Sequence, residues 1–403
     1  MAERLAELTR LCFLRSLGGL REHSRFLKVR CYERRTRPVC CWVSLFGLAL
    51  VDSKAAGGCR GPRRWRGDGR ASHPPNLCFP AAEVLYLVAR TMTRTALLFA
   101  GQGAQVVGMG KDLAENFPAA RNWFERANAV LGYDLASVCF HGPELELTKT
   151  ENAQPAIFLV SWVVFQLLKE RVPSLRYQAM AGLSLGEFTA LAAAGAMSFD
   201  DGLRIVRQRG RFMQEACEAT RGGMAAIIGL DVSQTLSVCA EADVTLANFN
   251  CPGQLVVSGG MERIAKAVEL AKAKGAKRAI ALPVAGAYHS PLMASAKPRL
   301  QAVLAVANLS RPTVVVVSNV TAQPHGPADE IRHRLVEQIT ASVRWEQSMR
   351  YLLADGFTRF IELGPGTALS GFMKRIDQRA QMLNVADVAS LENAVKALGT
   401  HGE

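Results

Sequence analysis

Short apolar segments that end in glycine-rich loops and lead into helix-forming segments recur along this 403-residue chain after Met92. Residues 95–100 and 177–181 are two such segments, and residues 313–318 and 357–363 continue the pattern. Apolar runs of this length between amphipathic segments are typical of strands that are buried on both faces of a parallel sheet. The pattern therefore predicts an α/β fold, in which helices cover a mainly parallel, hydrolase-like sheet.

One stretch in the middle of the chain has a different order of predicted strands and helices. Its strand and helix patterns follow the order βαββαβ: residues 224–230, 233–242, 244–248, 255–258, 261–274 and 278–283. That order is typical of a ferredoxin-like module. We therefore expect a large α/β domain made of residues 92–220 and 286–397, with a small ferredoxin-like domain, residues 221–285, inserted into it. A cleft between the two domains is the expected ligand site.

The first 91 residues differ from the rest in composition. Residues 1–92 contain 17 of the 48 Lys and Arg residues, 7 of the 35 Asp and Glu residues, and six of the ten cysteines, so most of the net charge of +13 belongs to them. Three interpretations are open: an organelle transit peptide, a nucleic-acid-binding arm, or sequence translated ahead of a start at Met92. We expect a disordered extension without a part in the chemistry, and no nucleic-acid partner.

Several classes of protein and site are not expected. The longest apolar run, residues 40–51, is shorter than the roughly 20 residues that cross a bilayer as a helix, so we expect no membrane association. No Cys-x-x-Cys or His-x-x-x-His pair occurs, so we expect no metal site. Dinucleotide and phosphate-loop motifs are missing as well, and we expect no cofactor.

Residues 182–186 fit Gly-x-Ser-x-Gly, the strand-to-helix elbow that exposes a nucleophilic serine. An apolar strand pattern precedes this motif and an Ala-rich helix pattern follows it, so Ser184 is the candidate nucleophile. The alternative is a serine that only caps the helix. Backbone N–H groups of Gln102, in the glycine loop after the first strand, and of Leu185 are the candidate donors of an oxyanion hole.

A serine hydroxyl needs a base, and at neutral pH that base is most often histidine. Among the seven histidines, His141 lies in a surface turn, and His289 follows the inserted domain, where the chain returns beside the expected cleft. The others lie in the extension, a Pro/Gly loop, a solvated helix start or the C-terminus: His23, His73, His325, His333 and His401. His289 is therefore the candidate base, and a hydrogen-bonded core histidine is the alternative. No acidic residue stands out as its partner.

An arginine lies on the apolar face of the helix predicted over residues 200–218. At 3.6 residues per turn, Arg209 falls beside Ile205, Phe212 and other apolar side chains. A buried guanidinium needs an anion, which either the protein or a ligand supplies. Arg209 is therefore either a fork for a substrate carboxylate or half of a structural ion pair.

Taken together and in this order, these residues resemble the malonyl-CoA:acyl carrier protein transacylase family. The similarity extends from Met92 to about Ala397. The segments that carry it are 99–105, 107–110, 154–156, 182–187, 209–214, 248–254, 289–293, 318–320 and 362–366. The resemblance implies a transfer of malonyl from coenzyme A to the phosphopantetheine thiol of acyl carrier protein, through a malonyl ester of Ser184, for fatty acid biosynthesis.

The resemblance also implies roles for individual residues. His289 would be the base, oriented by the backbone carbonyl of Gln338, and Arg209 would bind the carboxylate of malonate. Further substrate contacts would come from Gln102, Leu185, Gln154 and Asn250. Two positions depart from the family pattern: Leu183 replaces the usual histidine before the nucleophile, and Ala100 replaces the usual proline before Gly-Gln-Gly. Leu183 puts the selectivity between malonyl and methylmalonyl groups in doubt.

Alternative functions are a patatin-like serine acyl hydrolase and a non-catalytic docking module for acyl carrier protein. The hydrolase needs an aspartate in a late Asp-Gly turn, and Asp355-Gly356 is the matching pair. We expect a monomer whose partners are acyl carrier protein and a coenzyme A thioester. We expect it in the cytoplasm, or in mitochondria or plastids if residues 1–91 are a transit peptide.

Overall fold

The computed structural model describes residues 26–32, 38–44, 50–51 and 93–399, which divide into two units, Met1–Met92 and Thr93–Glu403. In the first unit, β1 (Phe26–Tyr32), β2 (Pro38–Ser44) and β3 (Leu50–Val51) form an antiparallel sheet. The sequence pattern does not predict these strands. The rest of the first 92 residues lies outside the described ranges, and the role of the extension stays a prediction.

The larger unit is built on a five-stranded sheet in the order β10-β5-β4-β11-β12, in which all neighbours are parallel. Its strands are β4 (Arg94–Phe99), β5 (Ala179–Gly182), β10 (Val315–Val317), β11 (Phe357–Leu363) and β12 (Gln381–Val385). The first four lie at predicted strands, and the α/β prediction is confirmed. The apolar pattern does not predict β12, because this edge strand is largely only partly buried.

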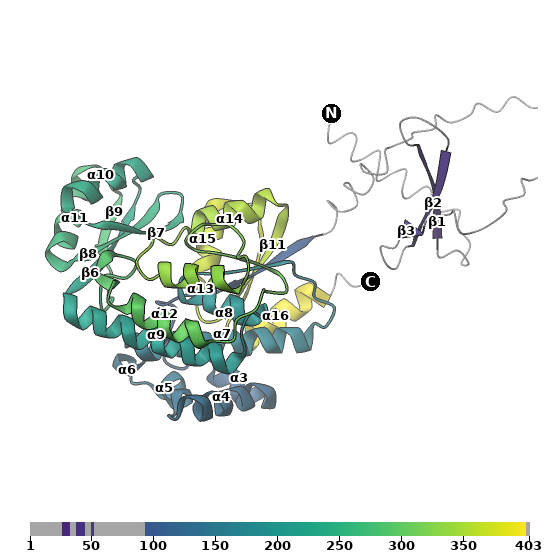
Figure 1. Ribbon diagram of the computed structural model, residues 1–403, viewed down its shortest axis with the longest axis horizontal. Helices are drawn as coiled ribbons and strands as arrows, with labels where there is room; N and C mark the ends of the chain where they lie inside the picture. The colour runs from purple at the N-terminus through teal and green to yellow at the C-terminus, as the bar shows by residue number, and fades with distance from the viewer. Residues whose placement is uncertain (1–25, 33–37, 45–49, 52–92, 400–403) are drawn as a thin grey trace, which may run out of the picture. The chain divides into compact units, whose positions relative to one another are not determined.

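Two layers of helices cover the sheet, because alternate strand residues point to opposite faces. Leu97 and Phe99 of β4 belong to one apolar cluster, while Ala96 and Leu98 belong to the other. The first cluster includes α7 (Thr150–Arg171), α8 (Leu185–Ala193) and α9 (Phe199–Thr220), and the second includes α14 (Trp345–Ala354) and α15 (Ala368–Ile376) (Figure 1). Within the described ranges, no helix is long and apolar enough to cross a membrane.

Apart from the two helices that pack on a second sheet, the remaining helices of the larger unit are mostly short. They are α3 (Lys111–Asn116), α4 (Pro118–Leu131), α5 (Leu135–His141), α6 (Glu144–Thr148), α12 (Ala296–Val306), α13 (Ala328–Glu337) and α16 (Val388–Gly399). A single turn of 3₁₀ helix, Pro291–Met293, follows His289. Helices α4, α7 and α9 contact one another, and α3 to α6 lie together at one end of the unit in Figure 1.

A second, antiparallel sheet has the order β7-β8-β6-β9. Its elements are β6 (Gly222–Ile228), α10 (Val232–Ala242), β7 (Thr245–Cys251), β8 (Gln254–Gly260), α11 (Met261–Ala273) and β9 (Arg278–Ala281). This is the predicted βαββαβ order, and the inner face of the sheet and both helices share one apolar cluster. Domain boundaries at residues 221 and 285 stay predictions.

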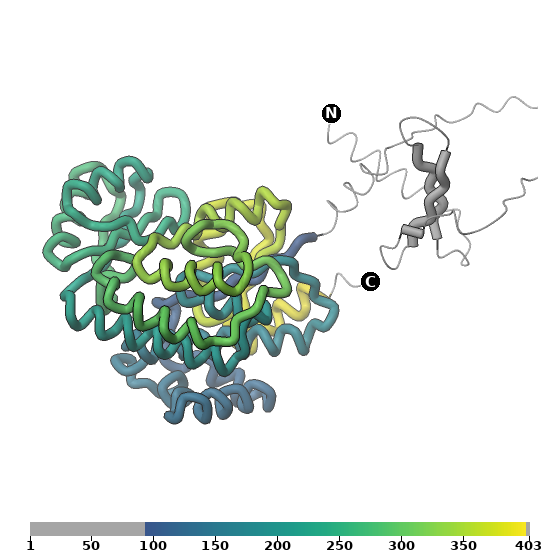
Figure 2. The backbone as a smooth tube through the Cα atoms, in the orientation of Figure 1, coloured from purple at the N-terminus to yellow at the C-terminus, as the bar shows by residue number. Residues whose placement is uncertain are grey.

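The small module contacts the rest of the larger unit at several places, including α14, α15 and the point where the chain enters and leaves the module. A Cβ atom on Gly222 would lie 2.6 Å from Cβ of Ala287, so the chain enters and leaves the module at neighbouring points, as the tube in Figure 2 lets the reader follow. In addition, the N–H of Val343 donates to the carbonyl of Ala247 at 2.8 Å, and the N–H of Phe249 donates to the carbonyl of Val343 at 2.9 Å. Strand β7 is thereby attached to the segment that precedes α14.

Candidate active site

Ser184 occupies the tight turn between β5 and α8, with a φ of 52°. Its backbone N–H donates to Oδ1 of Asn319 at 2.6 Å, and Nδ2 of Asn319 donates to the carbonyl of Gly182 at 2.8 Å. Asn319 follows β10, which pairs with β5, so neighbouring strands hold the turn from their carboxyl ends. These contacts stabilise a left-handed backbone that a serine rarely adopts.

The two glycines of the elbow allow β4, β5 and α8 to approach closely. A Cβ atom on Gly182 would lie 1.9 Å from the carbonyl carbon of Gly186, and one on Gly186 would lie 2.2 Å from the carbonyl oxygen of Phe99. Both distances are far below van der Waals contact. The motif is therefore required by backbone packing as well as by the serine.

We expect Gly182→Ala to lower the free energy of unfolding by about 1–3 kcal/mol or more, because the new methyl group overlaps rigid backbone. Chemical denaturation followed by circular dichroism measures this change. Gly371→Ala is the control, because Gly371 is an exposed residue of α15 whose Cβ would meet nothing within 4 Å. Equal unfolding midpoints for the two variants would contradict the packing argument.

His289 lies directly against the serine. Its Nε2 is 2.8 Å from Oγ of Ser184, and its Nδ1 is 2.8 Å from the backbone carbonyl oxygen of Gln338. A carbonyl only accepts hydrogen bonds, so Nδ1 carries the proton and Nε2 presents its lone pair to the hydroxyl. Burial, and secondly the charge of Arg209, lowers the pKa of His289 to about 4. The imidazole is therefore neutral at pH 7 and able to accept a proton.

Arg209, on α9, is 1% exposed, as the helical periodicity predicts. Nη1 donates to Oε1 of Gln154 at 2.7 Å, while Nη2 donates to Oγ of Ser184 at 3.0 Å and to Oε1 of Gln338 at 2.9 Å. Burial lowers the pKa of Arg209 to about 10, and the charge of Glu187 partly offsets this effect. The guanidinium remains a cation at pH 7.

The partners of Arg209 decide between the two interpretations of this residue. None of the carboxylates in the described ranges lies within 4 Å of its nitrogens, and its Nε is buried with no hydrogen-bond partner among the described residues. The observed partners are neutral amides and a hydroxyl, so a structural ion pair does not explain this residue. A buried cation without a carboxylate in direct contact, 3.0 Å from a candidate nucleophile, can bind the carboxylate of a substrate.

The other predicted substrate contacts differ in how close they lie to Ser184 and Arg209. Gln102 lies near this group, because its Oε1 is 3.4 Å from Nε2 of Gln154, and a Cβ on Gly101 would lie 2.5 Å from the carbonyl oxygen of Leu183. Leu185 is the first residue of α8, where N–H groups have no partner within the helix. Asn250, on β7, is buried without a described partner for its Oδ1, and no hydrogen bond joins it to Ser184 or His289.

Comparison with known proteins agrees with this geometry. The family described as Acyl transferase domain matches residues 96–396. A malonyl CoA-acyl carrier protein transacylase of Bacillus subtilis (strain 168) is 45% identical over 312 residues, which cover 76% of this chain and 98% of the relative. This chain belongs to the malonyl CoA-acyl carrier protein transacylase family. It is thus an acyltransferase.

Solved structures of the family have the same fold. The malonyl CoA-acyl carrier protein transacylase of Coxiella burnetii superposes with a TM-score of 0.74 at 36% identity, covering 76% of this chain and 98% of that one. A malonyl-transacylase in complex with a type II polyketide synthase acyl carrier protein gives a TM-score of 0.74 at 39% identity, covering 76% of this chain and 100% of that one. Residues 1–92 of this acyltransferase lie outside the matched family segment.

Asp355 does not lie with the nucleophile. It precedes β11 and pairs with Arg94 at the start of β4, whereas Ser184 follows the end of β5. Because β4, β5 and β11 are parallel, Asp355 lies at the amino ends of these strands and Ser184 at their carboxyl ends. The hydrolase alternative, with an Asp355 dyad, therefore does not fit this acyltransferase.

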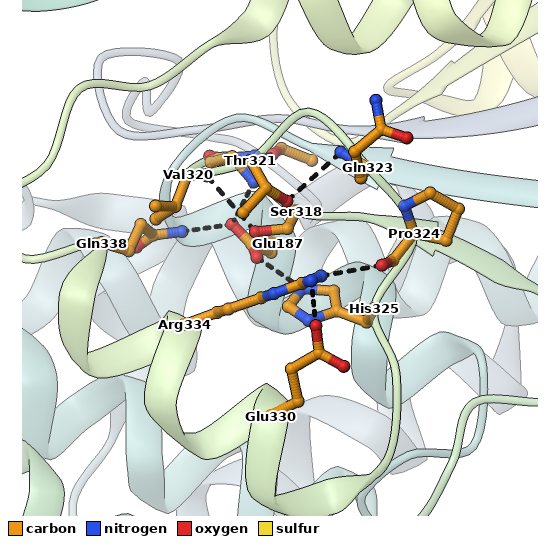
Figure 3. Close-up of polar contacts among 12 residues, drawn as sticks. Glu187, Ser318, Val320, Thr321, Gln323, Pro324, His325, Glu330, Arg334 and Gln338 are labelled. Carbon is orange, nitrogen blue, oxygen red and sulfur yellow. Dashed lines mark hydrogen bonds and ion pairs between the residues drawn. The ribbon is translucent and has the colours of Figure 1, made fainter.

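Sequence reasoning overlooked two buried residues behind the serine. His325, assigned to a Pro/Gly loop, is fully buried at its side chain and bonds through Nε2 to Oε1 of Glu187 at 2.6 Å (Figure 3). Glu187 comes directly after the elbow motif, and a charged residue at that position was a usable signal. No local pattern marks His325. The cleft expected between the domains stays a prediction, because neither of two cavities, of about 280 and 570 Å³, is lined by Ser184 or His289.

Proposed function

We propose that this acyltransferase moves a malonyl group from coenzyme A to the phosphopantetheine thiol of an acyl carrier protein, with Ser184 and His289 as the reacting pair. The observation that carries the substrate assignment is Arg209, a buried cation without a carboxylate partner beside the serine hydroxyl. Malonyl differs from acetyl by one carboxylate, which a guanidinium binds with two parallel hydrogen bonds. The unpartnered Nε lies beside Nη2, whose hydrogen bond to Ser184 a bound carboxylate would replace.

The reaction then proceeds in two balanced steps. Oγ of Ser184 attacks the thioester carbonyl while Nε2 of His289 takes its proton, and the carbon–sulfur bond breaks. The proton passes from His289 to the departing thiolate of coenzyme A. In the second step the carrier-protein thiol gives its proton to His289 and attacks the malonyl ester, and Ser184 recovers its hydroxyl.

The oxyanion of each tetrahedral intermediate needs donors that are in place before the reaction. We assign this role to the backbone N–H groups of Leu185 and Gln102, because the first opens α8 next to Ser184 and the second belongs to the loop packed on Leu183. Gln154 supports Arg209 in the same site. Asn250 stays a predicted substrate contact.

Three expectations from the sequence stay predictions: a cytoplasmic location, a monomeric state and a reaction without a cofactor. Support for a carrier-protein partner comes from the similar malonyl-transacylase solved with its acyl carrier protein. The Ser184–His289 geometry and the unpartnered Nε of Arg209 support a thioester with a carboxylate on its acyl group.

Mass spectrometry of the full chain tests the proposal. We expect incubation with malonyl-CoA alone to add one malonyl group to Ser184, found by intact mass and peptide mapping, because the ester accumulates when no acceptor thiol is present. Adding phosphopantetheinylated carrier protein should remove the adduct and load the carrier. Release of free malonate without a carrier, at the rate at which malonyl-CoA is consumed, would indicate a hydrolase. A folded protein that leaves malonyl-CoA untouched would indicate a docking module.

A further inference from the structure

Glu187 is a carboxylate buried directly behind the nucleophile, in the first turn of α8. It is 0% exposed and accepts hydrogen bonds from Nε2 of His325 at 2.6 Å and from Nε2 of Gln338 at 2.6 Å (Figure 3). A third comes from the N–H of Asn319 at 3.1 Å. Its side chain contacts neither Oγ of Ser184 nor the ring of His289. Glu187 therefore acts on the reaction indirectly, through these three donors and through the effect of its charge on Arg209.

Gln338 connects Glu187 to Arg209. The Nε2 group of its amide donates to Oε2 of Glu187 and, at 3.0 Å, to the carbonyl of Ser184, while its Oε1 accepts from Nη2 of Arg209 at 2.9 Å. If this amide were reversed, its NH₂ group would face the donor Nη2 of Arg209, and its oxygen would face the acceptor Oε2 of Glu187. The carboxylate thus selects the orientation of Gln338 that holds the guanidinium beside the serine.

His325 in turn holds the carboxylate. The loop that carries it is attached to β10 by a hydrogen bond of 2.8 Å from the N–H of His325 to the carbonyl of Val316. Arg334 of α13 donates to the carbonyl of Pro324 at 2.7 Å and also pairs with Glu330 (Figure 3). Nδ1 of His325 is buried without a partner among the described residues, so Glu187 is the side chain that its ring binds.

We propose that Glu187 and His325 are a positioning pair that determines the acyl selectivity of the enzyme. The pair orients the Gln338 amide, and this amide places the Arg209 fork where the carboxylate of malonate binds. The inference rests on the proposed function, because it assigns the origin of malonyl preference within that same site. Neither residue is catalytic.

Glu187→Gln is the direct test, because an amide cannot accept from all three donors. With its oxygen toward Gln338 and Asn319, the new amide forces His325 into the tautomer with a buried Nδ1–H that has no acceptor. With its oxygen toward His325, it opposes the NH₂ group of Gln338, which then turns a donor toward Arg209. The first arrangement keeps Gln338 on Arg209 but is disfavoured by the unpaired Nδ1–H, whereas the second turns Gln338 over and releases the guanidinium.

The measured quantity is the ratio of Ser184 loading by malonyl-CoA to loading by acetyl-CoA, determined by intact mass on the full chain. We expect Glu187→Gln to lower this ratio by about tenfold, as the loss of one well-made charged hydrogen bond does. The loss should lie in the malonyl-CoA concentration needed for half-maximal loading, with acetyl loading close to unchanged. A merely structural effect lowers the folded fraction and leaves the ratio as it was.

Glu362→Gln is a matched control. Glu362, on β11, is also 0% exposed and also accepts three hydrogen bonds at a helix start, from the N–H of Leu369, the N–H of Ser370 and the hydroxyl of Ser370. None of these groups contacts Ser184 or Arg209. We expect this variant to lose stability but to keep the wild-type malonyl preference.

A second pair of variants covers the case in which Glu187→Gln does not fold. His325→Gln keeps a donor within reach of Glu187 and should retain the malonyl preference, whereas His325→Phe removes that donor and should lower the preference. An unchanged ratio in both Glu187→Gln and His325→Phe, with wild type preferring malonyl, would overturn the inference alone. A wild-type protein that does not load malonyl would instead overturn the proposed function.

Discussion

Replacement of Arg209 by alanine is expected to slow the loading of Ser184 by malonyl-CoA by about 30-fold to 5,000-fold. The physical reason is the loss of a buried, hydrogen-bonded charge pair with the substrate carboxylate, which is worth about 2–5 kcal/mol. Acetyl-CoA has no such carboxylate, so its loading should fall much less, and the malonyl preference should disappear. Initial rates of adduct formation with the two thioesters, measured by intact mass, give both numbers.

Arg204→Ala is the control for this prediction. Arg204 lies on the same helix but on its exposed face, where it forms a surface pair with Asp201 at 3.7 Å. Its removal should leave the ratio of malonyl to acetyl loading as in the wild type. If Arg209→Ala kept the wild-type ratio as well, the carboxylate contact would have to be assigned to another residue.

His289→Ala is expected to slow malonyl loading by about 10²- to 10⁴-fold, the usual contribution of a positioned general base. The loss should affect acetyl and malonyl thioesters alike, because the proton comes from Ser184 and not from the acyl group. Stopped-flow measurement of coenzyme A release reports this step. A loss confined to malonyl-CoA would indicate that His289 binds the substrate and does not act as the base.

The low pKa of His289 also predicts the pH dependence of the wild-type enzyme. Burial lowers this pKa from 6.5 to about 4, which favours the neutral form, so the base is lost only when the pH falls toward 4. The acid limb of kcat/KM, which reports the free enzyme, should therefore lie well below pH 6.5. Circular dichroism over the same range separates this limb from acid unfolding. An acid limb near 6.5 would show that the imidazole is solvated.

These measurements also distinguish acyl transfer from the two alternative functions. A docking module without activity would show no dependence on His289 or Arg209, since neither group then meets a reacting thioester. A hydrolase would retain the dependence on His289 but would pass the acyl group to water in the presence of carrier-protein thiol. The transacylase assignment requires both dependences together with transfer to the thiol.

Local features of the chain were predicted well because their physical cause lies within a few residues. Gly182 and Gly186 mark the elbow, since the backbone approach that they permit occurs within one strand-to-helix turn. Arg209 was placed on the buried face by the 3.6-residue repeat of its own helix. The strand β12 escaped the same reasoning, because an edge strand with partly buried residues lacks a continuous apolar run.

Contacts between distant segments were not predicted from patterns in the residues. The acceptor for His289, the backbone carbonyl of Gln338, came from family resemblance and not from any pattern in the residues themselves. Glu187 and His325 are 138 positions apart, and the histidine was assigned to a Pro/Gly loop. Asp355 matches the Asp-Gly pattern of a hydrolase dyad, but it lies at the opposite end of the parallel strands from Ser184.

The sequence by itself determined the α/β class, the serine elbow and the buried arginine, because apolar periodicity and glycine spacing act over short stretches of backbone. Only the tertiary structure decided that His289, Arg209 and Gln338 meet at Ser184 and that Glu187 lies behind them. The reason is the sheet order: β10 pairs with β5, which brings the segments after these strands together across more than 130 residues. Strand order depends on the packing of whole layers, and no local pattern records it.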